Sequence, residues 1–308
     1  MDYILIGGKS LTKQMIKEHS DGNILADGII RVNNLSDTKD IFSHEVYKIN
    51  VESNIDYLSI ANAIKKIIDS SCLFKIKCFI HGSNSFNKNS IGYNSRDIEV
   101  NAGKILENAG FKVSLENPSI TIIVNVINNK SYITKISGNY LVHEKNYINR
   151  AGFKLIEAFD YFKIDVEGLH IKKALDIGAA PGGFSYEMAK KGIFVDAIDP
   201  GLLDSKLIDV HINHIKKRIE NFSTNTIYDI ITNDMNVFPL ESAKIILKLK
   251  ENLRTRGIVI MTIKCINKKS YSYYMKQALM ELKDSFEGFE FKHLPHNRAE
   301  LTMLCIKK

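Results

Sequence analysis

The stretch Ala174-Leu-Asp-Ile-Gly-Ala-Ala-Pro-Gly-Gly-Phe184 decides the fold class of this chain. An apolar run ends in Asp176, a glycine-rich turn follows from Gly178 to Gly183, and residues 184–190 have the pattern of a helix start. A strand, a glycine-rich turn and a helix in this order are typical of the nucleotide-binding corner of a doubly wound α/β sheet. The sequence therefore predicts an α/β protein with a Rossmann-like sheet.

Two kinds of cofactor can use such a corner, and the side chains around it favour one of them. A dinucleotide needs G-x-G-x-x-G, with its pyrophosphate at the helix N-terminus. Here the turn reads Gly-Ala-Ala-Pro-Gly-Gly and follows the acidic Asp176, and a carboxylate suits a cationic amino-acid head better than a pyrophosphate. The next strand ends in Asp199, which can accept hydrogen bonds from ribose hydroxyls. These residues favour S-adenosylmethionine (SAM) over NAD; the alternative is an ordinary tight turn that binds no ligand.

The glycines of the turn carry part of this prediction. Gly178, Gly182 and Gly183 lack a Cβ atom, so we expect a ligand to lie against the backbone there. Together with flanking residues and one carboxylate from a later strand, the candidate cofactor-binding set is Asp176, Gly178, Ala180, Pro181, Gly182, Gly183, Phe184, Asp199 and Asp234.

Composition and charge set broader limits. The chain has 308 residues, 44% of them hydrophobic, and a net charge of +7, which suit a two-domain globular protein with a polyanionic partner. Its cysteines show neither a C-x-x-C pair nor zinc-site spacing, so we expect reduced thiols and no metal site; they are Cys72, Cys78, Cys265 and Cys305. No apolar run reaches the length of a membrane span and no signal peptide is recognisable. We therefore expect a cytoplasmic protein without a membrane partner.

The pattern of elements divides the chain into three parts. A small α/β extension covers residues 1–50, a second α/β domain covers residues 51–137, and the Rossmann-like domain covers residues 138–308. In the second part the expected elements are a helix over 57–69, a strand over 75–80, a helix over 98–109 opened by Ser95 and Asp97, a strand over 111–115, and a hairpin over 119–134.

The second part resembles a THUMP domain, an RNA-binding module of RNA-modifying enzymes. The matching residues are Ser95-Arg-Asp-Ile-Glu99, Gly103 to Leu106, Phe111 to Leu115, Asn117-Pro118 and the hairpin over 124–133. The resemblance implies docking on structured RNA and no chemistry. The alternative is a generic α/β domain.

Four charged residues of the third part are placed to meet. Asp234 follows a predicted strand over 227–232, and Lys264 ends another over 257–263. Glu300 begins the last predicted strand, and Lys154 lies near the start of a predicted helix over 150–162. Ligands of open α/β sheets sit at the carboxyl ends of the strands, and an antiparallel last strand starts at that same edge. We therefore expect two lysines and two carboxylates beside the cofactor; singly, each has an ordinary structural or surface alternative.

A basic and aromatic stretch follows the second of these strands. Its residues are Lys264, Lys268, Lys269, Tyr271, Tyr273, Tyr274 and Lys276. Lysines bind phosphates and aromatic faces stack on splayed bases, so the stretch is a candidate RNA contact. The alternative is a solvated basic loop that leads into a predicted helix over 271–286 with one buried tyrosine face. A further helix is expected over 243–253.

The third part as a whole resembles the FtsJ-type RNA ribose 2′-O-methyltransferases. The matching motifs are Arg150-Ala-Gly-Phe-Lys-Leu155, Leu175 to Ser185, Asn233-Asp-Met235, Ile260-Met-Thr-Ile-Lys264 and Arg298-Ala-Glu300. The family uses a Lys-Asp-Lys-Glu tetrad, which falls here on Lys154, Asp234, Lys264 and Glu300. A THUMP domain joined to an FtsJ-type domain resembles bacterial 23S rRNA ribose methyltransferases of that arrangement.

The resemblance implies a role for each tetrad residue. Lys264 is expected to be the general base for the ribose 2′-hydroxyl, with its pKa lowered by the nearby ammonium of Lys154. Asp234 and Glu300 are expected to orient the lysines and the attacking oxygen, and holding the reactants in line is expected to carry much of the rate.

Several alternatives stay open. The substrate is expected to be large-subunit rRNA, with tRNA as the alternative. A non-catalytic RNA-binding or ribosome-assembly protein with a relic SAM fold and a hemolysin-type protein are further alternatives. The residue that contacts adenine is not identified by the family pattern, and Glu220 is only a weak candidate. The absence of Asn-Pro-Pro-Tyr after Asp234 disfavours methylation of a base amino group.

Overall fold

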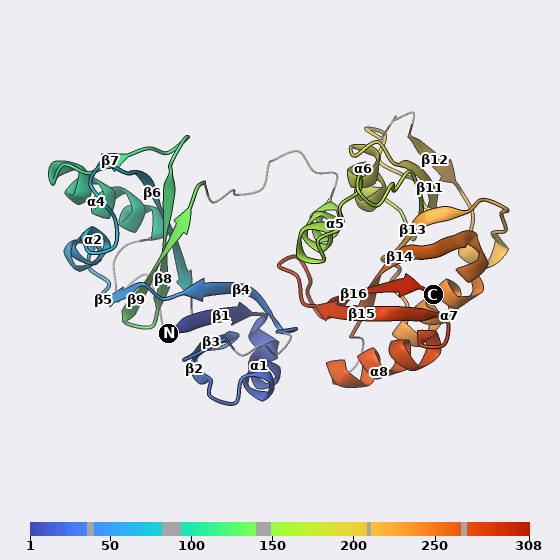
Figure 1. Cartoon of the computed structure of the whole chain (residues 1–308), viewed down its shortest axis with the longest axis horizontal. Coiled ribbons are helices and arrows are strands. Elements are labelled where there is room, and N and C mark those ends of the chain that lie inside the picture. The colour runs from blue at the N-terminus through green and yellow to red at the C-terminus, as the bar shows by residue number, and fades with distance from the viewer. Residues whose placement is uncertain (36–39, 82–93, 140–148, 208–210, 266–269) are drawn as a thin grey trace. The chain divides into compact units, whose positions relative to one another are not determined.

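A computed structural model describes residues 1–35, 40–81, 94–139, 149–207, 211–265 and 270–308. The chain forms two compact units, Met1–His143 and Glu144–Lys308 (Figure 1). Each unit has its own β-sheet core, so the units are described separately.

The first unit begins with a small antiparallel sheet. Its strand order is β2-β3-β1-β4, with β1 over Tyr3–Gly7, β2 over Asn23–Ala26, β3 over Ile29–Val32 and β4 over Ser43–Lys48. A short helix, α1 (Thr12–Glu18), follows β1 after a single 3-10 turn, η1 (Lys9–Leu11). Ile4 and Ile6 of this sheet pack in one apolar cluster with Ile123 and Ile127 of the next sheet. The first fifty residues therefore share a core with the segment after them, and their status as a separate extension stays a prediction.

The second sheet of this unit has the order β5-β9-β8-β6-β7. Its strands are β5 (Val51–Ser53), β6 (Leu73–His81), β7 (Lys112–Val113), β8 (Ile120–Ile127) and β9 (Lys130–Ser137). Figure 1 shows the helices α2 (Tyr57–Lys65) and α4 (Ser95–Asn108) beside this sheet, and their buried apolar residues form one cluster with residues of its strands. Asn94 caps α4 through a capping box with Asp97, which explains why the helix starts at Ser95.

The strand predicted over 111–115 is shorter than expected. β7 pairs with β6 only at Leu73 and Phe74. Further along the edge of β6, the Glu99 carboxylate of α4 accepts the backbone N–H of Cys78 at 2.9 Å. A helix side chain thus satisfies that donor, which removes one reason for the strand to continue.

The second unit contains a seven-stranded sheet of order β12-β11-β10-β13-β14-β16-β15. Its strands are β10 (Lys173–Ile177), β11 (Phe194–Ile198), β12 (Ile212–Ile215), β13 (Tyr228–Asn233), β14 (Leu253–Lys264), β15 (Phe286–Lys292) and β16 (Glu300–Lys307). Strands β10 to β14 run parallel to one another, whereas β16 runs antiparallel to β14. The predicted Rossmann-like methyltransferase sheet is confirmed.

The described residues of this unit form four α-helices beside the sheet. They are α5 (Arg150–Tyr161), α6 (Gly183–Ala189), α7 (Pro239–Lys248) and α8 (Tyr271–Leu282). Leu155 and Phe159 of α5 and Met188 of α6 lie in the main apolar cluster with residues of the sheet. Figure 1 shows α5 and α6 close together, and α7 near α8. Two further 3-10 turns are η2 (Ile219–Asn221) and η3 (Lys250–Asn252).

Two predicted helix boundaries in this unit are wrong. The helix expected over 243–253 begins at Pro239, since proline at the first helical turn has its fixed φ preset, and it ends at Lys248. Leu253, which is buried, starts β14 instead. The helix expected to reach Phe286 ends at Leu282, because Phe286 is buried as the first residue of β15.

Candidate active site

The sheet brings the four charged residues to one edge. Asp234 directly follows β13, and Lys264 is the last residue of β14. Glu300 is the first residue of β16 and is the register partner of Lys264. Lys154 comes from α5, whose N-terminus is capped by the Asn149 side chain. The four charged side chains therefore meet at the carboxyl ends of the strands, as expected.

The four side chains form a closed ring of ion pairs. The ammonium of Lys154 lies 2.7 Å from Asp234 Oδ2 and 3.0 Å from Glu300 Oε1. The ammonium of Lys264 lies 2.8 Å from Asp234 Oδ1 and 2.6 Å from Glu300 Oε2. Thr262 donates a further hydrogen bond to Asp234 Oδ1 at 2.9 Å. Each lysine thus bridges both carboxylates, and neither carboxylate is a partner of one lysine alone.

Burial makes this ring electrostatically strong. Lys154 is 4% exposed and Glu300 is 6% exposed. Burial alone raises the pKa of Asp234 and of Glu300, but the two ammonium groups outweigh it and hold both pKa values below the ordinary range. Both carboxylates are therefore ionised at neutral pH.

The expected lowering of the Lys264 pKa is not found. Burial lowers this pKa, but the nearby charges of Asp234 and Glu300 raise it by more, so the net shift is upward. The ammonium of Lys154 faces the same carboxylates and does not overcome them. Lys264 is consequently protonated in this arrangement, and it must lose a proton before it can accept one.

The glycine-rich turn also has a structural basis, which the sequence did not predict, and the expected ligand contact stays a prediction. A Cβ on Gly178 would lie 2.6 Å from Met235 Cγ, and a Cβ on Gly182 would lie 2.0 Å from Leu207 Cδ1. Both glycines also have positive φ, 73° and 109°. A Cβ on Gly183 would lie 2.0 Å from Asn149 Oδ1. The protein's own atoms occupy the position of an added Cβ at each of the three glycines, so packing explains them without a ligand, and positive φ adds a second reason at Gly178 and Gly182.

A cavity of about 460 Å³ is lined by two residues of the glycine-rich turn and by one member of the ion-pair ring, Asp234. Four of the predicted cofactor-binding residues line it: Gly178, Ala180, Asp199 and Asp234. The Asp199 carboxylate is held by the backbone N–H groups of Ala180, at 3.1 Å, and Gly201, at 2.7 Å. Among the described lining residues, the predicted Asp176, Pro181, Gly182, Gly183 and Phe184 do not occur.

Asp176 lies inside the domain. It is 1% exposed and accepts hydrogen bonds from Ser185 Oγ at 2.6 Å and Thr232 Oγ1 at 2.8 Å. Burial, only partly offset by these bonds, raises its pKa to about 7. The side chain therefore links the start of α6 to β13 within this structure.

Several residues that line this cavity were not predicted from the sequence. Ile219 and Met235 contribute apolar surface to the cavity, and Lys217, Arg218 and Asn236 contribute polar surface. Glu220, the weak candidate for adenine, also lines it. The pattern of η2, an apolar residue between charged ones, gave no specific signal for a ring-binding pocket.

A second missed contact joins α5 to the loop before Glu300. The Glu157 carboxylate bonds His296 Nδ1 and accepts the His296 backbone N–H at 3.1 Å. The His296 ring stacks on Phe153, with ring centroids 4.4 Å apart. Glu157 lies one helical turn after Lys154, so this contact ties the helix of one tetrad residue to the loop of another.

The basic and aromatic stretch is only partly available for stacking. Tyr271 is 8% exposed and Tyr274 is 2% exposed, so they form the buried face of α8 and the prediction that they stack on RNA bases is wrong. Tyr273 is 39% exposed and accepts a hydrogen bond from Gln277. Lys268 and Lys269 lie outside the described residues.

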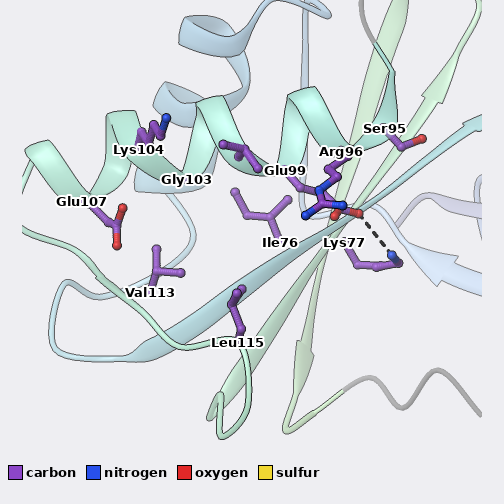
Figure 2. Close-up of a pocket in the computed structure, with 11 residues that line it drawn as sticks. Ile76, Lys77, Ser95, Arg96, Glu99, Gly103, Lys104, Glu107, Val113 and Leu115 are labelled. Atoms are coloured by element: carbon purple, nitrogen blue, oxygen red, sulfur yellow. Dashed lines mark ion pairs between the residues drawn. The ribbon is translucent and has the colours of Figure 1, made fainter. Parts of the chain in front are cut away.

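The first unit carries a larger cavity, of about 650 Å³, which we call the α4 groove (Figure 2). Figure 2 shows cationic and acidic side chains around an aliphatic surface. Its lining residues are Ile76, Lys77, Ser95, Arg96, Glu99, Val100, Gly103, Lys104, Glu107, Val113 and Leu115. A Cβ on Gly103 would meet no atom within 4 Å, so this mid-helix glycine opens onto the groove. Seven of these eleven residues belong to the segments on which the THUMP resemblance rests.

Comparison with known proteins supports one class for the second unit. The family model of the FtsJ-like methyltransferases matches residues 147–287. This match, a little under half of the chain, makes the second unit similar to the FtsJ-like methyltransferases, whose cofactor is SAM.

Relatives with curated sequences match about half of the chain or less. An uncharacterized protein of Methanocaldococcus jannaschii is 34% identical over 52% of this chain and 47% of its own length. A ribosomal RNA large subunit methyltransferase M of Marinomonas sp. is 30% identical over 52% of this chain and 48% of its own length. A second protein of that name, from Pasteurella multocida, is 33% identical over 42% of this chain and 38% of its own length. The matches span about half the length of these relatives or less. Within the described residues, no helix is both long and apolar enough to cross a membrane.

Proposed function

We propose that the chain transfers a methyl group from SAM to the 2′-hydroxyl of a ribose in RNA. The ring of Lys154, Asp234, Lys264 and Glu300 at the carboxyl edge of the sheet carries this proposal. A ring that includes a buried lysine is costly to desolvate, and it contributes weakly to stability relative to apolar packing. Its place beside a cavity in an FtsJ-like domain supports a catalytic role instead.

The cavity fits SAM by the chemistry of its donors and acceptors. Asp199 is fixed by two backbone N–H groups, and its remaining lone pairs can accept hydrogen bonds from ribose hydroxyls. Ile219 and Met235 offer apolar surface to a flat ring, and the acidic Asp234 suits a cationic amino-acid portion. When bound, SAM supplies an electrophilic methyl group. Asp176 is proposed to act through the fold of the turn, since it lies outside the cavity.

The ring handles the proton of the 2′-hydroxyl. Lys264 is the proposed general base, and only its neutral form can accept the proton. Asp234 and Glu300 hold the two lysine amines in fixed positions, so the hydroxyl would meet an oriented acceptor. Because the carboxylates raise the Lys264 pKa, only a small fraction of the base is neutral at pH 7. Orientation of the reacting groups must then supply a large part of the rate.

The RNA is proposed to be large-subunit rRNA, with which two relatives' names agree. The α4 groove is proposed as an RNA contact of the THUMP-like segment, because Lys77, Arg96 and Lys104 can bind phosphates around an aliphatic surface. We also propose that the protein is cytoplasmic.

The test uses purified full-length protein, tritiated SAM and separate pools of unmodified rRNA and tRNA. We expect 2′-O-methylated nucleosides from rRNA with the wild type and loss of the product with Lys264→Ala. Lys244→Ala, at an exposed position of α7, is the matched control and should keep the activity. Label on tRNA alone would replace rRNA as the substrate, and a base-methylated product would contradict the ribose mechanism.

A further inference from the structure

A cluster of three side chains in the first unit lies outside everything assigned to methyl transfer. Glu18 and His19 stand at the end of α1, and Asp40 precedes β4. One ligand atom from each of the three lies within 4.8 Å of the others. The small sheet thus gathers one imidazole and two carboxylates at one place.

His19 is the unusual member of this cluster. It is 2% exposed, and neither ring nitrogen has a hydrogen-bond partner among the described residues. A buried polar group without a partner costs about 1–3 kcal/mol, so such groups call for an explanation. A neutral imidazole nitrogen is also the commonest protein ligand of metal ions.

The spacing fits a shared ion. His19 Nε2 lies 3.5 Å from Asp40 Oδ1. Two atoms bound tetrahedrally to one Zn²⁺ at its usual bond lengths are about 3.3 Å apart. The separation therefore matches two ligands of one ion, and a Glu18 oxygen, within 4.8 Å of the ligand atoms of His19 and Asp40, is near enough to be a third.

Hydrogen bonds from the backbone and from a serine hydroxyl already hold the two carboxylates in place. Glu18 accepts the backbone N–H groups of Ile41, at 3.2 Å, and Phe42, at 3.3 Å. Asp40 accepts the backbone N–H of Ser43 at 3.2 Å and also the hydroxyl of Ser43. Metal-binding carboxylates characteristically have such supporting hydrogen bonds, which orient them toward the ion.

We propose that Glu18, His19 and Asp40 bind one divalent transition-metal ion of the Zn²⁺ type. The ion would join the end of α1 to the segment before β4 and remove the unsatisfied state of one His19 nitrogen. A mixed imidazole and carboxylate set suits Zn²⁺ better than Mg²⁺ or Ca²⁺, which prefer oxygen ligands alone. Three protein ligands leave a fourth position for water.

The experiment uses the full chain, freed of metal by a chelator and then titrated with Zn²⁺ by calorimetry and with Co²⁺ by absorption. We expect one equivalent to bind with a visible Co²⁺ spectrum that lacks the near-ultraviolet thiolate band, since cysteine takes no part. His19→Gln should weaken binding by at least about tenfold. His81→Gln is the control, because its amide can keep the hydrogen bond to Asn125.

A structural contribution of His19 is separated by a second variant and a second readout. Asp40→Asn keeps an acceptor for Ser43 but loses charge, and it should also weaken Zn²⁺ binding by about tenfold or more. Zn²⁺ should raise the melting temperature of the wild type and of His81→Gln more than that of either ligand variant. Three outcomes would overturn the proposal: no stoichiometric binding, a thiolate band in the Co²⁺ spectrum, or equal affinity in His19→Gln. In each case His19 and Asp40 would form only an ion pair.

Discussion

The glycine-rich turn and the ion-pair ring are the two parts of the site that the sequence marks most clearly, and they have different origins. The space beside Gly178, Gly182 and Gly183 is filled by the protein's own atoms, so the turn would need these residues without any ligand. The ring gathers four charges where apolar residues would pack as well or better. The comparison shows that a motif can mark a site through the fold that builds it, whereas side chains without a structural need indicate chemistry more directly.

The largest expected effect is on the pH dependence of the reaction, which tests whether the ion-pair ring takes part in the chemistry. The pKa of Lys264 is raised above its ordinary value of 10.5, and only the neutral amine can act as base. The rate of the chemical step should therefore rise about tenfold per pH unit from pH 6 upward, without levelling below about pH 9. Single-turnover kinetics with saturating SAM and RNA measure this rate. A plateau near pH 7 would mean that bound ligands lower the Lys264 pKa strongly, or that another group is the base.

Asp176→Asn tests whether the Asp176 carboxylate contributes to the site through its charge or through its hydrogen bonds within the fold. The folded pKa of about 7 lies above the ordinary 3.8, so the folded chain keeps a proton that the unfolded chain releases, and wild-type stability falls as pH rises from about 4 to 7. Asparagine has no such proton to lose and can still bond Ser185 and Thr232. The variant should therefore gain stability relative to wild type by roughly 1.4 kcal/mol per pH unit in this window, and no more above it.

Denaturant unfolding of the two proteins at pH 4, 6 and 8 measures this difference, and SAM titration at pH 8 accompanies it. If the variant folds well but binds SAM at least tenfold more weakly, the negative charge of Asp176 matters to the cofactor after all. A stability difference that does not change with pH would contradict the raised pKa.

Gly183→Ala changes the glycine-rich turn and, through the start of α5, the ion-pair ring. The added Cβ would lie 2.8 Å from the Gly152 backbone nitrogen and 2.0 Å from Asn149 Oδ1, so the start of α5 must move, and Lys154 moves with it. We expect a loss of about 1–3 kcal/mol in the free energy of unfolding, the usual cost of overpacking, and a loss of activity.

Gly103→Ala is the matched control for this change. Gly103 also lies in a helix, but nothing stands within 4 Å of its added Cβ, so the substitution should stabilise the chain by about 0.5–1 kcal/mol. Thermal unfolding of both variants provides the check, and methyl transfer is measured for Gly183→Ala. Equal stability of Gly183→Ala and wild type would show that the turn adapts and that its glycines serve a ligand.

The smallest expected effect concerns Glu157, which supports the ring from outside. Glu157→Gln keeps one acceptor for the His296 backbone but loses the charged bond to its ring. Because Lys154 and Glu300 lose part of their mutual alignment, kcat should fall a few-fold to about tenfold while SAM affinity stays the same. A change in KM for SAM with constant kcat would place Glu157 in cofactor binding instead.

The sequence was sufficient where one periodicity and one topological rule acted together. Strong apolar runs located β13 and β14, and the rule that parallel strands end at one edge then placed Asp234 and Lys264 together. The antiparallel β16 completed the set, since its register pairs Glu300 with Lys264.

Other features depended on neighbours that a single segment does not reveal. The strands β2, β4 and β5 are short and partly exposed, so they lack a clear alternating pattern. The upward pKa shift of Lys264 results from two carboxylates at 2.6 and 2.8 Å, distances that no spacing predicts. The cavity residues Ile219 and Met235 belong to a turn and a loop whose apolar character is ordinary.

The antiparallel pairing of β16 also affects when the site can exist during biosynthesis. Lys154 and Glu300 bond each other across 146 positions of the chain. A nascent chain that has released α5 to β14 from the ribosome has three of the four charges and no closing carboxylate. The ring, and with it the proposed activity, would therefore form only after Glu300 has left the ribosome and β16 has paired with β14.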